Sequence, residues 1–241
     1  MKNNIQIRFQ LFLIIIFSFV FVVFLTPASV TVAGNDTRLA NQHNKGSKAS
    51  DNNQIAAKDR EDGAKIVGDF VKDVANKVAA VLNSKIAPNA KSKQLTEIFY
   101  SIADYEWMAK FVVARHWRSM SQTQQQSYIE AYKHYLAHSY VKHFNEYNGQ
   151  RFEFGSISEV NTSNYDGQYM VSVTIVQKNS DTAPINILYR LKMYSKNSIK
   201  IIDIIADNVS LLATQREDFN SVITRSGVPT LIENLRNAIN S

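Results

Sequence analysis

The sequence contains no cysteine, and this absence excludes several kinds of site at once. Without thiols the chain can form no disulfide, no thiolate metal site, no cysteine nucleophile and no lipid anchor on cysteine. Glycine is also scarce, with 8 residues in 241. No Gly-x-Gly-x-x-Gly, phosphate-binding loop or Gly-x-Ser-x-Gly motif is present, so nucleotide-binding and esterase functions have no motif to support them.

The charge balance is only mildly basic. The formal net charge is +6, and Lys2 and Arg8 in the first residues contribute to it. A nucleic-acid-binding domain carries a much stronger basic footprint, so we expect no nucleic-acid partner. A small basic excess suits contact with anionic lipid headgroups or with an acidic protein, although most such charge is ordinary solvated surface.

The first 33 residues have the composition of an export signal. Lys2 and Arg8 precede an apolar run from Leu11 to Leu25, and small residues follow up to Ala33. This pattern predicts a signal peptide, residues 1–33, that is cleaved after Ala33 and directs the protein to the periplasm of a bacterium. Because the apolar run is just shorter than a bilayer-spanning helix, an uncleaved membrane anchor is the alternative.

The composition changes again after the leader. Residues 34–62 are rich in Asn, Gln, Lys, Ser and Asp and contain almost no apolar side chains, which predicts a disordered linker. Residues 63–241 then have the length and apolar content of a single domain with one core.

The first half of this domain has helical periodicity. Apolar residues recur at intervals of three and four from Lys65 to Leu82, and again from Lys93 to Trp117, with a break at Pro88 between the two regions. Ser121 and Gln124 have the spacing of a capping box. They predict the start of a third helix that continues to about residue 147.

The second half alternates between apolar and polar residues. Strands are predicted over residues 151–160, 167–178, 184–194 and 198–206, followed by helices over residues 209–225 and 229–240, with Gly227 and Pro229 between them. One face of the sheet is apolar and must be covered by the helices. The expected fold is α+β, with helices packed on one face of a curved, mostly antiparallel four-stranded sheet.

Two segments resemble the sequence signature of one family. They are IDIIADNVSLL, residues 202–212, followed by Arg216, and DYEWMAK, residues 104–110, followed by His116-Trp117-Arg118. They are similar to the MlaC family, also called toluene-tolerance proteins. Two departures occur where the family commonly has Gly, at Ala114 and Asn208. Ala suits a helix interior better than Gly, so Ala114 is expected to change local packing only.

The resemblance implies a fold and a function. It implies a nuclear-transport-factor-two-like arrangement enclosing an apolar cavity, and a soluble periplasmic carrier of phospholipid that needs no cofactor. The implied partners are an inner-membrane ABC transporter complex and an outer-membrane lipoprotein complex of the Mla lipid-asymmetry pathway. From the faces of the predicted elements, we expect the cavity to be lined by Val171, Val173, Ile187, Tyr189, Leu191, Tyr132, Tyr140 and Phe144.

Asp203 interrupts an apolar strand, so it needs a hydrogen-bonding or charged partner. As a structural residue it accepts hydrogen bonds from the backbone or from Ser210, or pairs with Arg216. As a catalytic base it would make the protein a small cavity enzyme acting on an apolar substrate, for which the sequence offers no convincing partner donors. Asn208 suits a left-handed corner, and Ser210 suits the cap of the next helix.

The sequence leaves two further alternatives. His134 and His138 have the spacing of two zinc ligands on one helix face, but the sequence between them lacks the Glu of a metalloprotease helix, so we expect no metal site. If the leader is not cleaved, the chain could instead be a membrane-anchored interaction domain whose apolar face meets a partner helix.

Overall fold

A computed structural model describes residues 48–141, 151–160, 167–176 and 184–239. The helices of the first half are α2 (Lys48–Asn83), α3 (Pro88–Ile102), α4 (Tyr105–Val113), the short 3-10 helix η1 (Ala114–Ser119) and α5 (Gln122–Val141). They are followed by strands β1 (Arg151–Glu159), β2 (Gln168–Val176), β3 (Ile185–Ser195), β4 (Ser198–Ala206) and β5 (Val209–Ser210), and by helix α6 (Leu211–Ile239). The predicted leader and Phe144 lie outside the described residues.

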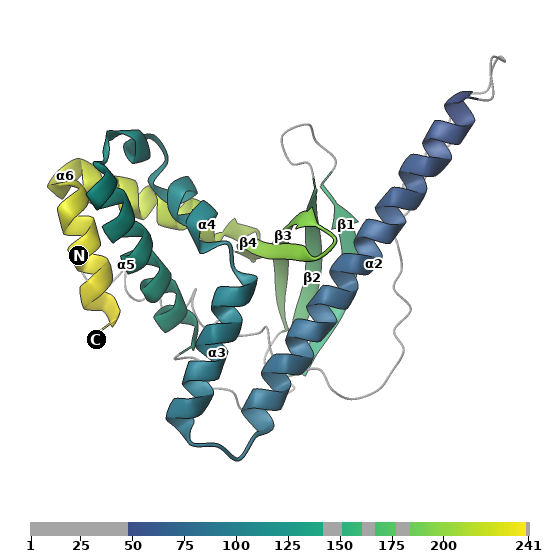
Figure 1. The fold of residues 1–241 in the computed structure, drawn as a ribbon, viewed down its shortest axis with the longest axis horizontal. Coiled ribbons are helices and arrows are strands. Elements are labelled where there is room, and N and C mark those ends of the chain that lie inside the picture. The colour runs from purple at the N-terminus through teal and green to yellow at the C-terminus, as the bar shows by residue number, and fades with distance from the viewer. Residues whose placement is uncertain (1–47, 142–150, 161–166, 177–183, 240–241) are drawn as a thin grey trace.

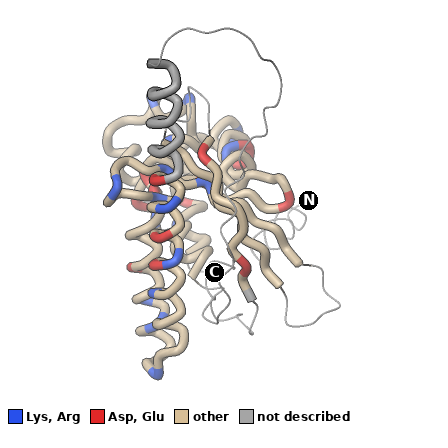
Figure 2. Tube along the Cα trace, turned by 90° about the vertical axis from the view of Figure 1, so that its right-hand side faces the viewer, with Lys and Arg blue, Asp and Glu red and all other residues tan. Residues whose placement is uncertain are grey.

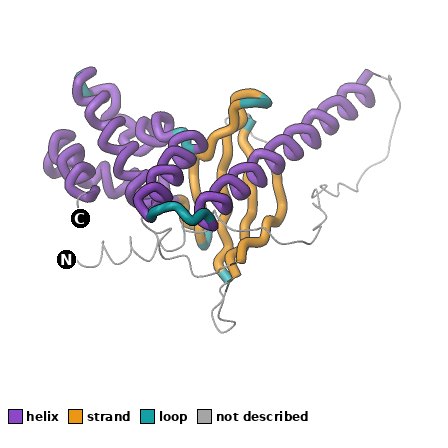
Figure 3. The backbone as a smooth tube through the Cα atoms, turned by 60° about the horizontal axis from the view of Figure 1, so that its bottom comes forward, coloured by secondary structure: helices purple, strands orange, loops and turns teal. Residues whose placement is uncertain are grey.

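The strands form one antiparallel sheet in the order β1-β2-β3-β4-β5. The α+β prediction is confirmed, and the sheet differs from the expected four strands only by the two-residue β5. Helix α2 crosses one face of the sheet, while α4, α5 and α6 form a separate bundle beside it (Figures 1 and 3). The turn between α2 and α3 extends away from both (Figures 1 and 2).

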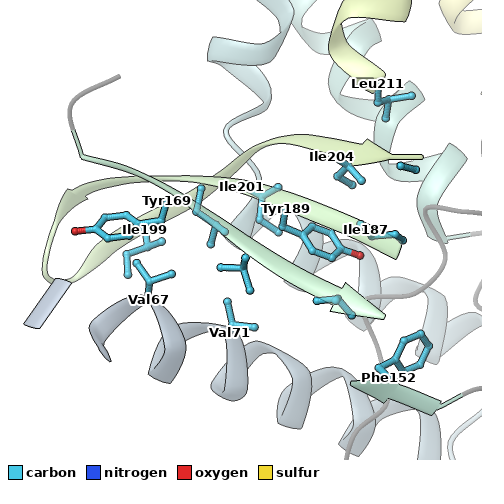
Figure 4. Close-up of a cluster of buried hydrophobic side chains, with 14 of the residues drawn as sticks. Val67, Val71, Phe152, Tyr169, Ile187, Tyr189, Ile199, Ile201, Ile204 and Leu211 are labelled. Carbon is cyan, nitrogen blue, oxygen red and sulfur yellow. The ribbon is translucent and has the colours of Figure 1, made fainter. Parts of the chain in front are cut away.

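The first hydrophobic core lies between α2 and the sheet. Strand alternation places one set of side chains of β2 and β3 on the same face, opposite Val67 and Val71 of α2 (Figure 4). All of these strand side chains are at most 2% exposed: Tyr169, Val171, Val173, Ile175, Ile187, Tyr189 and Leu191. Helix α2 comes close to the sheet at Gly63, where an added Cβ would lie 2.0 Å from the Tyr169 hydroxyl oxygen. The face predicted to line a cavity is therefore filled by α2.

A second core holds the helical bundle together. Tyr128 and Tyr132 of α5 are fully buried among side chains of α4 and α6, and the Tyr132 hydroxyl donates to Gln215 Oε1 at 2.7 Å. Helix α6 has a break at Gly227, whose φ of 80° is accessible to glycine, so the predicted end of a helix there is confirmed. Both hydrogen bonds of the Ser121–Gln124 capping box are present, at 2.9 and 3.2 Å.

Helix α2 begins at Lys48, whereas the sequence predicted a linker as far as residue 62. The segment contains Ala56, Ala57, Lys58 and Arg60, which are good helix formers, and it is continuous with the amphipathic part of the helix. An apolar face is needed for burial but not for helix formation at the end of a longer helix. Residues 34–47 lie outside the described residues.

The predicted helix from residue 93 to 117 is divided into α3, α4 and η1. Ala103 is extended and forms a parallel bridge with Ile201, and the N–H of Asp104 donates to the Ile201 carbonyl at 3.0 Å. Asp104 then caps α4 by accepting the N–H of Trp107 at 3.1 Å. Pairing with β4 therefore overrides the continuous helical periodicity of this segment.

Ala114 was expected in a helix interior, but it lies at the junction where α4 ends and η1 begins, so that expectation was wrong. It ends α4 with φ 45° and ψ −113°, a conformation that favours glycine because a Cβ is crowded there.

We expect Ala114→Gly to raise the free energy of unfolding by about 1 kcal/mol, measured by urea denaturation. Ala80→Gly, at an exposed position in the last turn of α2, should instead lower it by up to about 1 kcal/mol. A loss of stability from Ala114→Gly would contradict this account of the backbone.

Candidate functional site

An open cleft of about 560 Å³ lies between α2, α3 and the turn that joins β3 to β4. Its apolar wall is formed by side chains of three elements: Ile66, Phe70 and Val74 of α2, Ile98 and Ile102 of α3, and Ile199 of β4. The α2 and α3 residues of this wall belong to the apolar helix faces that the periodicity of the sequence predicted. The volume is within the range of pockets that bind small organic ligands.

The cleft is continuous with the core beneath α2. Ile199 belongs to that core, and Ile66, Phe70 and Ile102 pack against it while remaining partly exposed. The sheet side chains predicted as cavity lining lie in the same core. The cleft is thus a place where this apolar interior reaches the surface of the described structure.

The rim of the cleft carries charges of both signs, and the acidic ones are paired. Asp73 forms an ion pair with Lys77 at 2.6 Å, and Asp69 forms one with Lys65 at 2.7 Å. The hydrogen bond from Lys65 lowers the pKa of the Asp69 carboxyl. Two further cations, Lys196 and Lys200, come from the β3–β4 turn and the start of β4. An anionic group at this end of the cleft would therefore meet ammonium groups.

The β3–β4 turn is attached to the helices beside the cleft. The Lys200 ammonium donates to the Ser101 carbonyl, and the Tyr194 hydroxyl donates to Asp104 Oδ2. Together with the backbone bridge at Ala103, these bonds connect the turn to the α3–α4 corner. They fix one wall of the cleft, whereas α2 on the other wall contacts the sheet through side-chain packing.

The Tyr194 hydroxyl gives this attachment a pH dependence. Partial burial, and then the hydrogen bond to Asp104, raise the pKa of Tyr194 to about 12. A folded-state pKa above the unfolded one stabilises the fold below about pH 10, and this contribution is lost as the pH rises towards 12. We expect wild type to be more stable than Tyr194→Phe at pH 8 and the difference to shrink above pH 10, in urea denaturation. A difference that stays constant with pH would contradict this role.

The predicted lining residues fall into separate groups. Val171, Val173, Ile187, Tyr189 and Leu191 lie together beneath α2. Tyr132 lies instead in the bundle core, and Tyr140 packs against both cores. Burial raises the pKa of the Tyr140 hydroxyl well above its usual value. Whether these residues contact a ligand stays a prediction.

Asp203 is buried and accepts hydrogen bonds from its own chain segment. Its Oδ1 accepts the N–H of Ile204 at 2.8 Å and of Leu212 at 3.2 Å, and its Oδ2 accepts the Ser210 hydroxyl at 2.7 Å. Burial raises the pKa of the carboxyl, and these bonds and the Arg190 charge partly oppose that effect. The hydrogen bonds expected from Ser210 and from the backbone are present, and the structural role of Asp203 stays a prediction.

The corner after β4 has the predicted conformation. Asn208 has φ 63°, and Asp207 before it has φ 48°. The Ser210 hydroxyl oxygen accepts the N–H of Ala213 at 3.0 Å, as expected of a helix cap. Arg216 does not turn towards Asp203 but lies over the Phe111 ring, 5.2 Å from its centroid.

The histidine pair has other contacts. His134 Nε2 lies 2.7 Å from Glu130 Oε1, and its Nδ1 lies 3.1 Å from the Tyr100 hydroxyl. Within the part of the chain that the structure describes, no three His, Asp or Glu side chains come together as metal ligands would. Nor does any helix in that part have the length and apolarity needed to cross a bilayer.

Comparison with known proteins identifies the family. The family model for MlaC protein matches residues 72–237, which is more than half of the chain. The chain belongs to the MlaC family. A comparison with curated proteins gave no match.

Among solved structures, the MlaC-family chain is similar to a phospholipid-binding protein from Ralstonia solanacearum determined in complex with a phospholipid. The TM-score is 0.56 at 22% sequence identity, over 70% of this chain and 94% of that chain. At this identity the likeness concerns the fold. It agrees with the α+β architecture described above.

Within the MlaC-family fold, sequence reasoning missed the charged rim of the cleft. Lys196 lies in the turn between Ser195 and Ser198, Lys200 lies two residues beyond it in β4, and this pair of nearby lysines was the available signal. The two lysines reach the rim of the cleft only because the β3–β4 turn packs beside α2 and α3. That arrangement is tertiary and has no local pattern in the sequence.

Proposed function

We propose that this MlaC-family protein is a soluble periplasmic carrier of phospholipid. The observation that supports it most is the cleft whose apolar wall is continuous with the core between α2 and the sheet. Family membership and the phospholipid bound to the protein of similar fold support the same ligand class. The predicted export signal supports the compartment.

Such a carrier must keep the acyl chains of the lipid out of water. Two acyl chains contain about thirty methylenes, each worth about 0.8 kcal/mol when removed from water. A carrier must therefore enclose both chains, and the cleft is the opening through which they reach the apolar interior. We infer that α2 moves away from the sheet on loading, so that Val171, Val173, Ile187, Tyr189 and Leu191 contact the chains.

The phosphate of the lipid remains at the mouth of the cleft. Lys196 and Lys200 supply ammonium groups there, while the nearby carboxylates of Asp69 and Asp73 are already paired with lysines of α2. Charge-assisted hydrogen bonds to phosphate oxygens hold the headgroup without any covalent step. The lipid is cargo, and binding requires no cofactor.

The cellular role that we propose is the one implied by family membership. The carrier exchanges phospholipid with an inner-membrane ABC transporter complex and with an outer-membrane lipoprotein complex, and the transporter supplies the energy. The catalytic alternative gains no support, since both Asp203 oxygens already accept hydrogen bonds within the fold.

A transfer experiment tests the carrier function. Donor vesicles with labelled phospholipid and acceptor vesicles are separated by a filter that passes the protein but retains vesicles. The proposal predicts label in the acceptor chamber only when the protein is present, with the lipid chemically unchanged. Protein that binds phospholipid but transfers none would contradict the shuttle role, and chemically altered lipid would favour the cavity enzyme.

A further inference from the structure

The turn of the α2–α3 hairpin, residues 83–93, is a projecting surface with an unusual composition. We call these residues the hairpin tip. Residues 85–90 are all exposed, and Ile86, at 36% exposure, is one of three exposed large hydrophobic residues in the described chain. The tip extends beyond the sheet and the helical bundle (Figure 1).

The tip is positively charged. It contains Lys85, Lys91 and Lys93, and residues 74–96 contain no Asp or Glu. Figure 2 shows these basic positions in blue at the end of the hairpin, with the acidic positions in red farther from it. On α2, Lys65 and Lys77 are paired with carboxylates, whereas the tip contains no carboxylate to balance its three lysines.

The tip is held by its own hydrogen bonds. The Lys91 ammonium donates to the Leu82 carbonyl at 2.7 Å, and the Ser84 hydroxyl donates to the Val81 carbonyl at 2.6 Å. Pro88 starts α3 and restricts the backbone of the turn. Beneath the tip, Val78, Val81 and Leu95 close the hairpin with a small apolar cluster. The exposed Ile86 and the lysines are thus presented on a defined structure.

We propose that the hairpin tip docks on the surface of a bilayer that contains anionic phospholipid. Clustered lysines are attracted to the negative potential of such a surface, and an isoleucine at the apex can enter the boundary between headgroups and acyl chains. Protein interfaces instead favour aromatic residues and contain few lysines, and the tip contains no aromatic residue. The charge and composition together therefore favour a lipid surface over a protein partner.

This surface is separate from the lipid-binding cleft. The cleft residues of the hairpin lie nearer the sheet, at positions such as Ile66, Phe70 and Ile102. Docking requires no lipid in the cleft, so it can be tested independently of the carrier function. For a carrier, docking at the tip would bring the cleft close to a membrane without inserting the domain.

The test is co-sedimentation with vesicles of phosphatidylcholine alone or with about 30% phosphatidylglycerol, using exported protein recovered from a bacterial periplasm. The variants are Lys85→Gln/Lys93→Gln and Ile86→Ser. The matched control, Lys72→Gln/Arg225→Gln, removes the same charge at two other exposed sites. Wild type and variants are exported and recovered in the same way, so any contribution of the leader to vesicle binding is the same in each.

We expect wild type to bind the anionic vesicles and not the neutral ones, and to be released by high salt. Each lysine near the surface contributes about fivefold to partitioning, so the tip double variant should bind about 25-fold more weakly. The control should change binding by less than about threefold, and Ile86→Ser should weaken it several-fold without changing its salt dependence. Equal effects of tip and control variants, or no binding to anionic vesicles, would overturn the proposal.

Discussion

Replacement of Asp203 by alanine is expected to lower the free energy of unfolding by about 3 kcal/mol or more. The carboxylate accepts the N–H groups of Ile204 and Leu212 and the hydroxyl of Ser210, and it is 3% exposed. Alanine would leave these buried donors without an acceptor, and hydrogen bonds to a charged group contribute about 1.5–3 kcal/mol each. Urea denaturation followed by circular dichroism measures the loss.

Asp203→Asn is the informative companion variant. Its amide oxygen can still accept both N–H groups, and the Ser210 hydroxyl can rotate to face the amide nitrogen, so we expect a loss within about 1 kcal/mol. Because burial raises the pKa of Asp203, wild type loses stability relative to this variant as the pH rises above the usual aspartate value of about 3.9. Equal, large losses from alanine and asparagine would contradict the hydrogen-bonding account.

The second large effect concerns the cleft. Ser101→Trp should lower phospholipid binding at least tenfold, because Ser101 is an exposed lining residue and an indole there would occupy the space that the lipid needs. Its hydroxyl donates to the Ile98 carbonyl in the same helix, so the free energy of unfolding should change by about 0.5 kcal/mol or less. Bound lipid is measured after incubation of the delipidated protein with vesicles.

The matched control for the cleft variant is Ser221→Trp. Ser221 is also an exposed serine in a helix, but it lies on α6 and does not line the cleft. We expect this variant to bind phospholipid as wild type does. If both variants bind normally, the cleft is not the route of the lipid into the protein.

Local signals in the sequence were sufficient where the structure depends on neighbouring residues. The capping box at Ser121, the break at Gly227, and the corner formed by Asn208 and Ser210 all involve contacts within a few residues. The alternation of β2 and β3 likewise identified the buried face of the sheet, because period two is a property of the strand itself.

Features that depend on distant contacts were not predicted. The division between α3 and α4 arises because Ala103 pairs with Ile201, and the positive φ of Ala114 occurs at a second division, between α4 and η1. The cleft could not be predicted because it is formed by three elements from separate parts of the chain. Nothing in the stripes of α2 and α3 indicated which of their apolar residues would remain partly exposed.

The most direct test of the carrier account is native mass spectrometry, with lipid extraction, of protein recovered from a bacterial periplasm. The account predicts a species heavier than the chain by the mass of a phospholipid. That species should disappear on delipidation and return after incubation with vesicles. Protein that is recovered without lipid and takes up none from vesicles would contradict the account.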